Sequence, residues 1–168
     1  MTYQPKVVIL CGGRGERMGD LAAERPKPMV EIGGQPLLWH IMKHYEHRGY
    51  GYFVLAVGRF GSLVLDYVNG LTHLSRVHVE NTGWATQNGG RVKRLAPELT
   101  ETFFLAWGDG VTDLDLTTML SFHRSHGKLC TVATVRPPER FGSLEVSWCN
   151  APGYNFCPVR EFHEWRRS

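Results

Sequence analysis

Short runs of apolar residues alternate along the chain with segments whose apolar positions recur every three or four residues. The runs predict buried strands at residues 6–11, 52–57, 77–80, 102–107 and 128–135, with a further strand at 143–146. The periodic segments predict helices at residues 36–48, 62–68, 90–95 and 116–126. Strands that alternate with helices are typical of an α/β fold, here a Rossmann-like, mostly parallel sheet with helices on both faces.

The helix expected at 116–126 carries a signal at each end. Asp113 or Asp115 is placed to cap its first turn, and Gly127 is placed to close it. These two carboxylates are therefore interpreted as caps rather than as metal ligands. Pro36 and Gly49 bound the helix at 36–48 in the same way.

Composition narrows the function classes. The chain has 168 residues, 42% of them hydrophobic, which is enough for the core of a single domain. No apolar run is long enough to span a bilayer, and no signal-peptide core follows the N-terminus, so a cytoplasmic location is expected. The chain has 19 Lys and Arg residues and 16 Asp and Glu residues, a formal net charge of +3. The basic residues are dispersed along the chain, which argues against a nucleic-acid surface and suits small anionic ligands.

The four cysteines include no C-x-x-C pair, which argues against a zinc site or a disulfide framework. Cys11 and Cys130 fall inside strand-like runs, where a cysteine acts as a small hydrophobe. His40, His44 and His47 fall opposite the apolar stripe of their helix and are expected to face solvent. Ile41 occupies the position where a zinc protease needs Glu.

The first predicted strand runs into Gly12-Gly13-Arg14-Gly15-Glu16-Arg17. Glycines let the backbone approach a ligand closely, and consecutive N–H groups there can bind an anion. No lysine follows as in a Walker loop, and Met18 replaces the third glycine of a dinucleotide fingerprint, which disfavours a dinucleotide-dependent oxidoreductase. The alternatives are a phosphate-binding loop, which its position after the first strand favours, and a plain glycine-rich turn.

Two more charged residues are candidates for binding phosphate or a metal ion. Lys27 lies between Pro26 and Pro28, which restrict the backbone and bias Lys27 toward extended geometry, so it loses little freedom on meeting a phosphate. Asp109 follows the strand that ends at Trp107. A carboxylate there, beside glycines, suits Mg²⁺ held jointly with phosphates.

Several of these motifs together resemble the sugar-1-phosphate nucleotidyltransferase family, most closely its glucose-1-phosphate cytidylyltransferase branch. The resemblance covers residues 6 to about 146. The matching stretches are residues 8–17, 26–34, 38–43, 89–94, 108–111, 122–128, 136–138 and 140–142. Glu16 and Asn88 each stand where the family has Thr.

The resemblance implies transfer of a nucleotidyl group from a nucleoside triphosphate, CTP, to a sugar 1-phosphate, glucose 1-phosphate, with release of pyrophosphate. It implies that Arg17 stabilises the departing pyrophosphate, that Lys27 lies against the phosphates, and that Asp109 binds the cofactor Mg²⁺. The remaining nucleotide-binding positions that it implies are Leu10, Gly12, Gly13, Gly15, Gln87, Asn88, Gly89 and Gly108.

The expected domain organisation is a nucleotide-binding core at residues 1–146 and an unassigned tail at 147–168. No counterpart of the family's acceptor-binding portion is recognised in that tail, so the fold is expected to be truncated. The alternative function is therefore a non-catalytic nucleotide-binding module. A membrane partner is not expected, and formation of a homo-oligomer stays open.

Overall fold

The computed structural model describes residues 3–13, 25–71, 76–134, 143–146 and 159–163. The chain divides into two units, Met1–Gly127 and Lys128–Ser168. The boundary expected at residue 146 falls inside the second unit. The first unit holds the sheet and all of the described residues predicted to bind a nucleotide.

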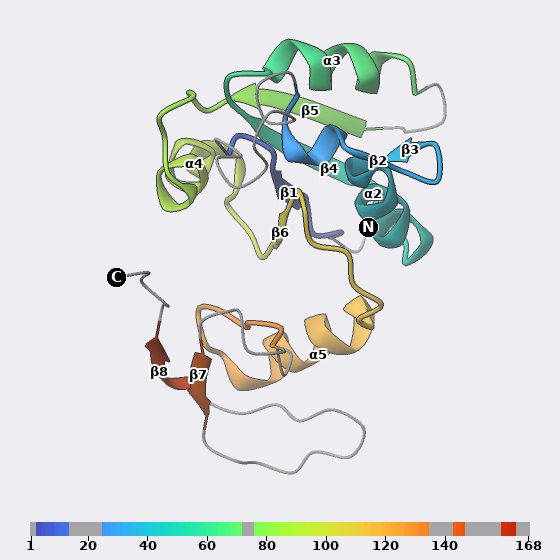
Figure 1. Cartoon of the computed structure of the whole chain (residues 1–168). Helices are drawn as coiled ribbons and strands as arrows, with labels where there is room; N and C mark the ends of the chain where they lie inside the picture. Colours follow the sequence, from blue (N-terminus) through green and yellow to red (C-terminus); the bar gives the residue numbers. More distant parts are fainter. Residues whose placement is uncertain (1–2, 14–24, 72–75, 135–142, 147–158, 164–168) are drawn as a thin grey trace. The chain divides into compact units, whose positions relative to one another are not determined.

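Four parallel strands form the sheet of the first unit, in the order β5-β4-β1-β6 (Figure 1). Each predicted strand of this set is present: β4 has the predicted bounds, β1 and β6 are shorter than predicted, and β5 is one residue longer at each end. Their bounds are Val7–Leu10 for β1, Tyr52–Val57 for β4, Arg76–Asn81 for β5 and Phe104–Trp107 for β6. The chain therefore adds strands outward on one side of β1 and then crosses to its other side.

Alternation along the strands explains why helices cover both faces. In β1, Val7 and Ile9 point into one apolar cluster, while Val8 and Leu10 point into another. Helices α2 (Leu37–His47) and α3 (Gly61–Asn69) supply the first cluster. Helix α4 (Asn88–Arg94) packs on the second through Val92, and buried Leu95, between α4 and the 3₁₀ turn η3 (Ala96–Glu98), belongs to it. The expected fold class is confirmed.

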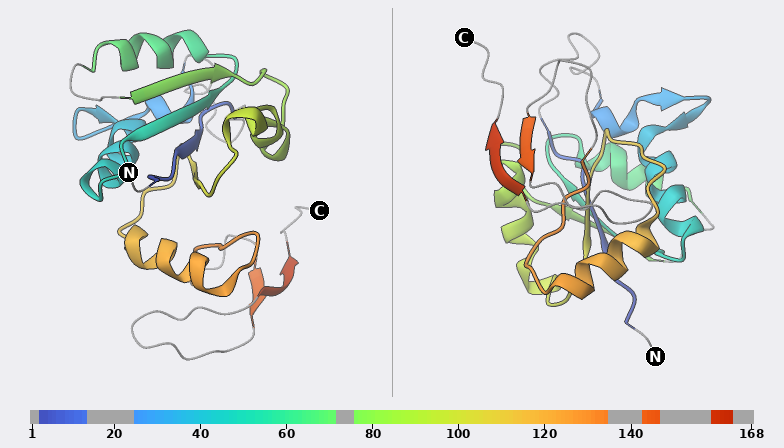
Figure 2. Two further views of the ribbon diagram at one scale, coloured as in Figure 1. Left: turned by 180° about the vertical axis from the view of Figure 1, so that it is seen from behind. Right: turned by 90° about the horizontal axis from the view of Figure 1, so that it is seen from below.

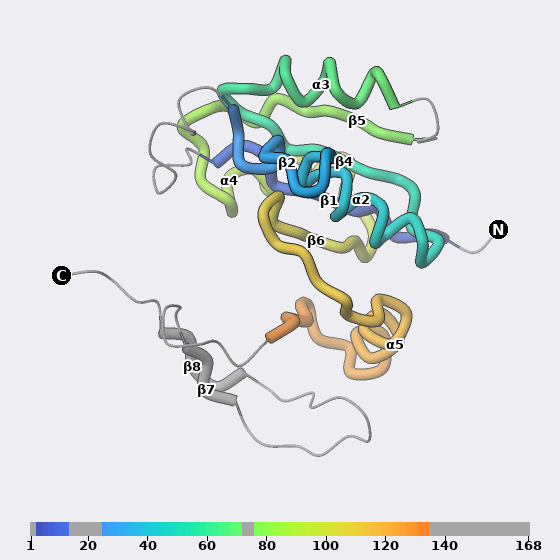
Figure 3. Tube along the Cα trace, turned by 45° about the vertical axis from the view of Figure 1, so that its right-hand side comes forward, coloured from blue at the N-terminus to red at the C-terminus, as the bar shows by residue number. Residues whose placement is uncertain are grey.

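The views from other directions show the same layers. Helix α3 runs along β5 (Figure 3), and α4 lies apart from α2 and α3 when the sheet is seen from behind (Figure 2). A short 3₁₀ turn, η2 (Lys27–Met29), precedes the two-stranded hairpin of β2 (Glu31–Ile32) and β3 (Gln35–Pro36). Lys27 thus begins a helical turn rather than an extended segment, because Pro28 is compatible with a first-turn position.

Helix α5 (Leu116–His126) has the predicted caps. Asp115 accepts hydrogen bonds from the backbone N–H groups of Thr117 and Thr118, at 3.0 and 3.3 Å. Gly127 closes the helix in the left-handed region, with φ 64°. Leu116 and Leu120 join the same apolar cluster as α2.

The strand predicted at 128–135 is wrong for the part of it that is described. Residues 128–134 have no strand, Leu129 is 104% exposed, and Cys130 is exposed rather than buried. Several residue types in this segment favour a strand. A strand also needs a neighbouring strand to hydrogen-bond with, and among the described residues this segment has none. Strand β7 (Ser143–Val146) is present and pairs antiparallel with β8 (Val159–His163), which was not predicted.

The histidines of α2 also differ from expectation. His47 is exposed, but His40 and His44 are half-buried. His40 Nε2 lies 2.9 Å from the carbonyl oxygen of Ile32, so the hairpin covers this part of the helix. In the described ranges, every helix is too short or too polar to cross a membrane.

Candidate functional site

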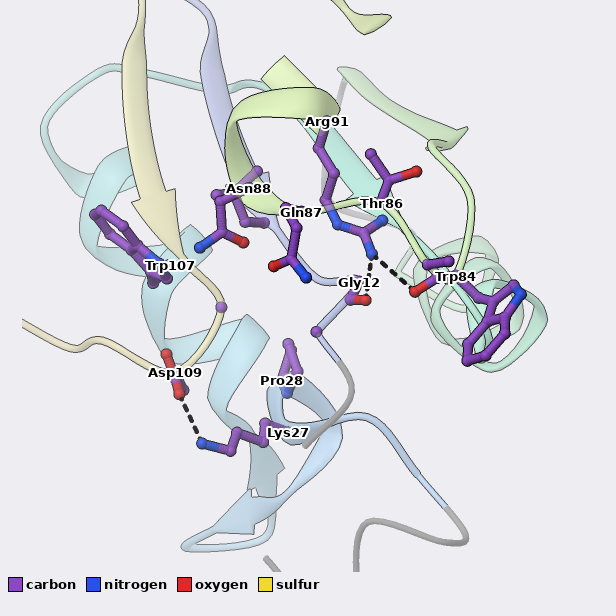
Figure 4. Close-up of a pocket in the computed structure, with 14 residues that line it drawn as sticks. Gly12, Lys27, Pro28, Trp84, Thr86, Gln87, Asn88, Arg91, Trp107 and Asp109 are labelled. Atoms are coloured by element: carbon purple, nitrogen blue, oxygen red, sulfur yellow. Dashed lines mark hydrogen bonds and ion pairs between the residues drawn. The ribbon is translucent and has the colours of Figure 1, made fainter. Parts of the chain in front are cut away.

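A pocket of about 560 Å³ opens at the carboxyl ends of β1 and β6 (Figure 4). This is where the strand order reverses, and ligands of open α/β sheets bind at such crevices. The volume lies in the usual range for small-molecule sites. The pocket is lined by Leu10, Gly12, Gly13, Lys27, Pro28, Trp84, Ala85, Thr86, Gln87, Asn88, Arg91, Trp107, Gly108 and Asp109.

The glycine loop begins where β1 ends. A Cβ at Gly12 would lie 2.1 Å from Nη1 of Arg91, so a side chain there would displace the buried guanidinium. Gly13 is exposed, and among the described residues a Cβ there would meet nothing within 4 Å, so its backbone is open to a ligand. Gly15 and Arg17, which the sequence also assigns to this loop, lie outside the described residues.

Two opposite charges meet on another side of the pocket. Lys27 Nζ in η2 lies 3.2 Å from Oδ2 of Asp109, just beyond β6. The approach of η2 to this strand depends on Gly108, whose added Cβ would lie 2.4 Å from Cγ of Pro28. Both charged side chains are partly exposed, at 26% for Lys27 and 41% for Asp109, and a ligand can reach both.

The side-chain amides of Gln87 and Asn88 lie next to each other at the start of α4 (Figure 4). An amide offers both hydrogen-bond donors and an acceptor, which is the set needed to read the edge of a base. Gly89, the third residue of this predicted group, is not among the pocket-lining residues.

The sequence did not single out Arg91 for this site. Arg91 stands with Lys93 and Arg94 in a short run of basic residues, yet Arg91 is only 1% exposed. The guanidinium donates to the carbonyl oxygen of Val57 at 3.0 Å and to Oγ1 of Thr82 at 2.6 Å. Burial, and secondly the charge of Arg94, lower the pKa of Arg91 from its usual value.

Two tryptophans frame the pocket and were also missed as site residues. Trp107 ends β6 and is 55% exposed, and Trp84 follows β5 and is 60% exposed. They lie at opposite ends of the close-up (Figure 4). A large aromatic ring that remains exposed at a pocket offers a stacking surface to a planar ligand. The signal available in the sequence was their place at the end of one predicted strand (Trp107) and a few residues after another (Trp84).

Two other reactive-looking groups have simpler explanations. Burial raises the pKa of the Cys11 thiol to about 12, so it stays protonated and acts as a small hydrophobe, as predicted. His78 lies between Glu80 and Glu98, with nitrogen-to-oxygen distances of 3.8 and 2.9 Å. These are contacts of a partly exposed ion-pair cluster, and none of the three residues lines the pocket.

The pocket combines exposed backbone of a glycine loop, one lysine, one carboxylate, amides and aromatic surface. Asp109 is the single carboxylate among the described residues that line it. Mg²⁺ is commonly held by one or two carboxylates together with phosphate oxygens and water, and Asp109 fits that donor set. This chemistry suits a phosphorylated, ring-containing ligand.

Comparison with known proteins agrees with this description. The sequence matches the nucleotidyl transferase family model over residues 6–164. The glucose-1-phosphate cytidylyltransferase of Salmonella typhimurium is 38% identical over 165 residues, a match that covers 84% of this chain and 64% of that protein. The chain therefore spans less than two thirds of the length of this relative.

Solved structures of low sequence identity share the fold. HddC from Yersinia pseudotuberculosis, complexed with GMP-PN, has a TM-score of 0.68 at 22% identity, covering 96% of this chain and 72% of that one. A UDP-glucose pyrophosphorylase complexed with UDP-glucose has a TM-score of 0.74 at 14% identity, covering 96% and 69%. The family match, the 38% identical relative and the fold together place the protein: the chain belongs to the nucleotidyl transferase family.

Proposed function

We propose that the protein transfers a nucleotidyl group from CTP to glucose 1-phosphate, releasing pyrophosphate and forming a nucleotide sugar. The observation that carries this proposal is the pocket at the ends of β1 and β6, where the glycine loop, Lys27 and Asp109 converge. Membership of the nucleotidyl transferase family supports the reaction class, and the cytidylyltransferase relative supports the choice of base and sugar.

The reaction requires little of the protein beyond positioning. A phosphate oxygen of the sugar 1-phosphate attacks the α-phosphorus of the triphosphate and forms a new P–O bond. The bond from the α-phosphorus to the bridging oxygen breaks, and pyrophosphate leaves with the electron pair. The nucleophile is already an anion, so alignment and charge neutralisation can carry the step without a general base.

Six of the pocket residues have a task in this proposal. The backbone of Gly12 and Gly13 binds the triphosphate, and Lys27 donates to phosphate oxygens at the reacting end. The amides of Gln87 and Asn88 contact the base. Asp109 would hold Mg²⁺, which when bound neutralises phosphate charge.

A product assay tests the proposal. The full chain is incubated with CTP, glucose 1-phosphate and Mg²⁺, and pyrophosphate release is measured against reactions with UTP, GTP and ATP. The proposal expects release that depends on both substrates and is largest with CTP. Larger release with another triphosphate would show that the protein uses that base instead of cytosine. Saturable CTP binding without pyrophosphate release would instead identify a non-catalytic nucleotide-binding module.

A further inference from the structure

Arg91 joins the ends of three strands through one buried guanidinium. Its Nη1 donates to the carbonyl oxygen of Val57 at the end of β4, and to Thr82 just after β5. Its Nη2 donates to the carbonyl oxygen of Gly12 just after β1. A weaker contact, 3.5 Å long, reaches the carbonyl oxygen of Trp84 (Figure 4).

Two glycines make room for this guanidinium. The hypothetical Cβ of Gly12 would collide with Arg91, as described above. A Cβ at Gly58, after β4, would lie 3.3 Å from Nη2 of Arg91 and 3.0 Å from the carbonyl oxygen of Gly12. Side chains are thus absent at the two positions where they would displace the guanidinium or the Gly12 carbonyl.

The hydrogen bond to Gly12 fixes the direction of a peptide group that lines the pocket. In a trans peptide the C=O of one residue and the N–H of the next point in opposite directions. Since the Gly12 carbonyl is turned toward Arg91, the Gly13 N–H points away from Arg91. If the peptide rotated, a carbonyl oxygen would replace an N–H donor, and it would repel a phosphate.

The charge of Arg91 has no carboxylate partner within the described part of the chain. Its described hydrogen bonds all go to neutral oxygens, and desolvation lowers its pKa. Arginine stays protonated even so. A buried cation paired only with neutral groups is costly, and an anion bound in the pocket that Arg91 lines offsets that cost.

We propose that Arg91 is a positioning residue for phosphate binding: it holds the Gly12–Gly13 peptide with its N–H available to a polyphosphate and supplies positive charge behind that peptide. The inference deepens the proposed function and rests on it for the identity of the nucleotide. The anion is expected to be a chain of phosphates because the proposed nucleotide is a triphosphate.

The test compares Arg91→Lys with Arg94→Lys, a matched change on the same helix. Arg94 donates to the carbonyl oxygen of Thr82 and does not line the pocket. Inorganic tripolyphosphate and the phosphate-free nucleoside cytidine are titrated into each full-length variant by calorimetry, after circular dichroism has shown that it is folded. Tripolyphosphate reports on the glycine loop, and cytidine reports on the base contacts.

Arg91→Lys keeps a charge but loses the forked geometry that reaches three acceptors. It should weaken tripolyphosphate binding at least about tenfold, as expected for loss of hydrogen bonds from a charged group, while cytidine binding changes less than about twofold. Arg94→Lys should leave both affinities within about twofold of wild type. Unchanged tripolyphosphate binding in Arg91→Lys, or an equal loss of both ligands, overturns the proposal.

A second variant covers the case in which Arg91→Lys does not fold. Thr82→Val removes one acceptor of the guanidinium and should produce a smaller loss that is again confined to tripolyphosphate; a wild-type affinity overturns the proposal. If wild type binds tripolyphosphate but releases no pyrophosphate with any nucleotide, the proposed function fails while the Arg91 comparison still decides the inference. If wild type binds neither CTP nor tripolyphosphate, both fail.

Discussion

Lys27 and Asp109 form an ion pair on one side of the pocket, with Nζ and Oδ2 3.2 Å apart. Both groups are partly exposed, and pairs of this kind contribute only about 0–1 kcal/mol to stability. A weak pair can be exchanged at little cost for stronger partners, a phosphate for Lys27 and a cation for Asp109. The pair also fixes where the two charges stand before a ligand arrives, since η2 is held against β6 by the contact of Pro28 with Gly108.

Replacing Lys27 by Gln tests the phosphate side of this pair. The variant keeps a polar side chain but removes the charge, so affinity for CTP should fall about tenfold or more, as for a charge-assisted hydrogen bond. Isothermal titration measures the change. Lys43→Gln is the control, because Lys43 pairs with Glu46 within α2 and does not line the pocket. Equal CTP affinity in the two variants would remove Lys27 from the proposed site.

Replacing Asp109 by Asn tests the metal side. We expect wild type to bind CTP more tightly when Mg²⁺ is present, and the Asn variant to lose most of that gain, because the neutral amide is a poor ligand for a hard cation. CTP titrations with Mg²⁺ and with EDTA measure the gain. Asp113→Asn, on the exposed segment before α5, removes the same charge outside the pocket and should retain it. A full Mg²⁺ effect in Asp109→Asn would contradict the assignment.

Gly108 and Gly110 flank Asp109 and should differ sharply in their tolerance of alanine. A Cβ at Gly108 would press on Pro28 and on the carbonyl oxygen of Leu10, at 2.4 and 2.9 Å. Within the described part of the chain, a Cβ at Gly110 would meet only the carbonyl oxygen of Trp107, at 3.9 Å. Overpacking of this kind typically costs about 1–3 kcal/mol, so Gly108→Ala should lower the free energy of unfolding by that amount and Gly110→Ala should not. Urea denaturation followed by fluorescence compares the two, and similar midpoints would show that η2 yields to the added methyl group.

Sequence periodicity was sufficient for the two central strands, β1 and β4, because each is a continuous apolar run buried on both faces. Val7–Leu10 is fully buried, and so is most of Tyr52–Val57. The same reasoning failed at residues 128–134, where a segment predicted as a buried strand is largely exposed. Burial depends on a neighbouring strand, which composition does not encode.

The pocket residues that could be predicted from the sequence are those whose role depends on their immediate neighbours in the chain. Lys27 and Asp109 were found because their neighbours restrict or open the backbone, which is a local property. Arg91 was not found, because its role depends on carbonyl oxygens of Gly12 and Val57 that are far from it in sequence. A basic residue in a short charged cluster looks like a solvated one until the fold brings those acceptors to it.

The N-terminal cap of α5 predicts a specific acid sensitivity. The hydroxyl of Thr118 donates to Asp115 at 2.9 Å. This bond, then the backbone N–H groups of Thr118 and Thr117 and the charge of Arg48, hold the pKa of Asp115 below its ordinary value. A carboxyl whose pKa is lower in the folded state stabilises that state above its unfolded pKa of about 3.9, and the stabilisation disappears as pH falls through the folded pKa.

Asp115→Asn isolates this effect, because Asn also caps helices well but cannot ionise. Wild type should unfold at a higher temperature than the variant near pH 6, and the difference should shrink steadily below about pH 4. Thermal unfolding followed by circular dichroism across this range measures it. Asp66→Asn on α3, outside the cap, controls for the loss of one negative charge. A difference between wild type and Asp115→Asn that stays constant down to the lowest pH would show that Asp115 acts through hydrogen bonding alone and not through its charge.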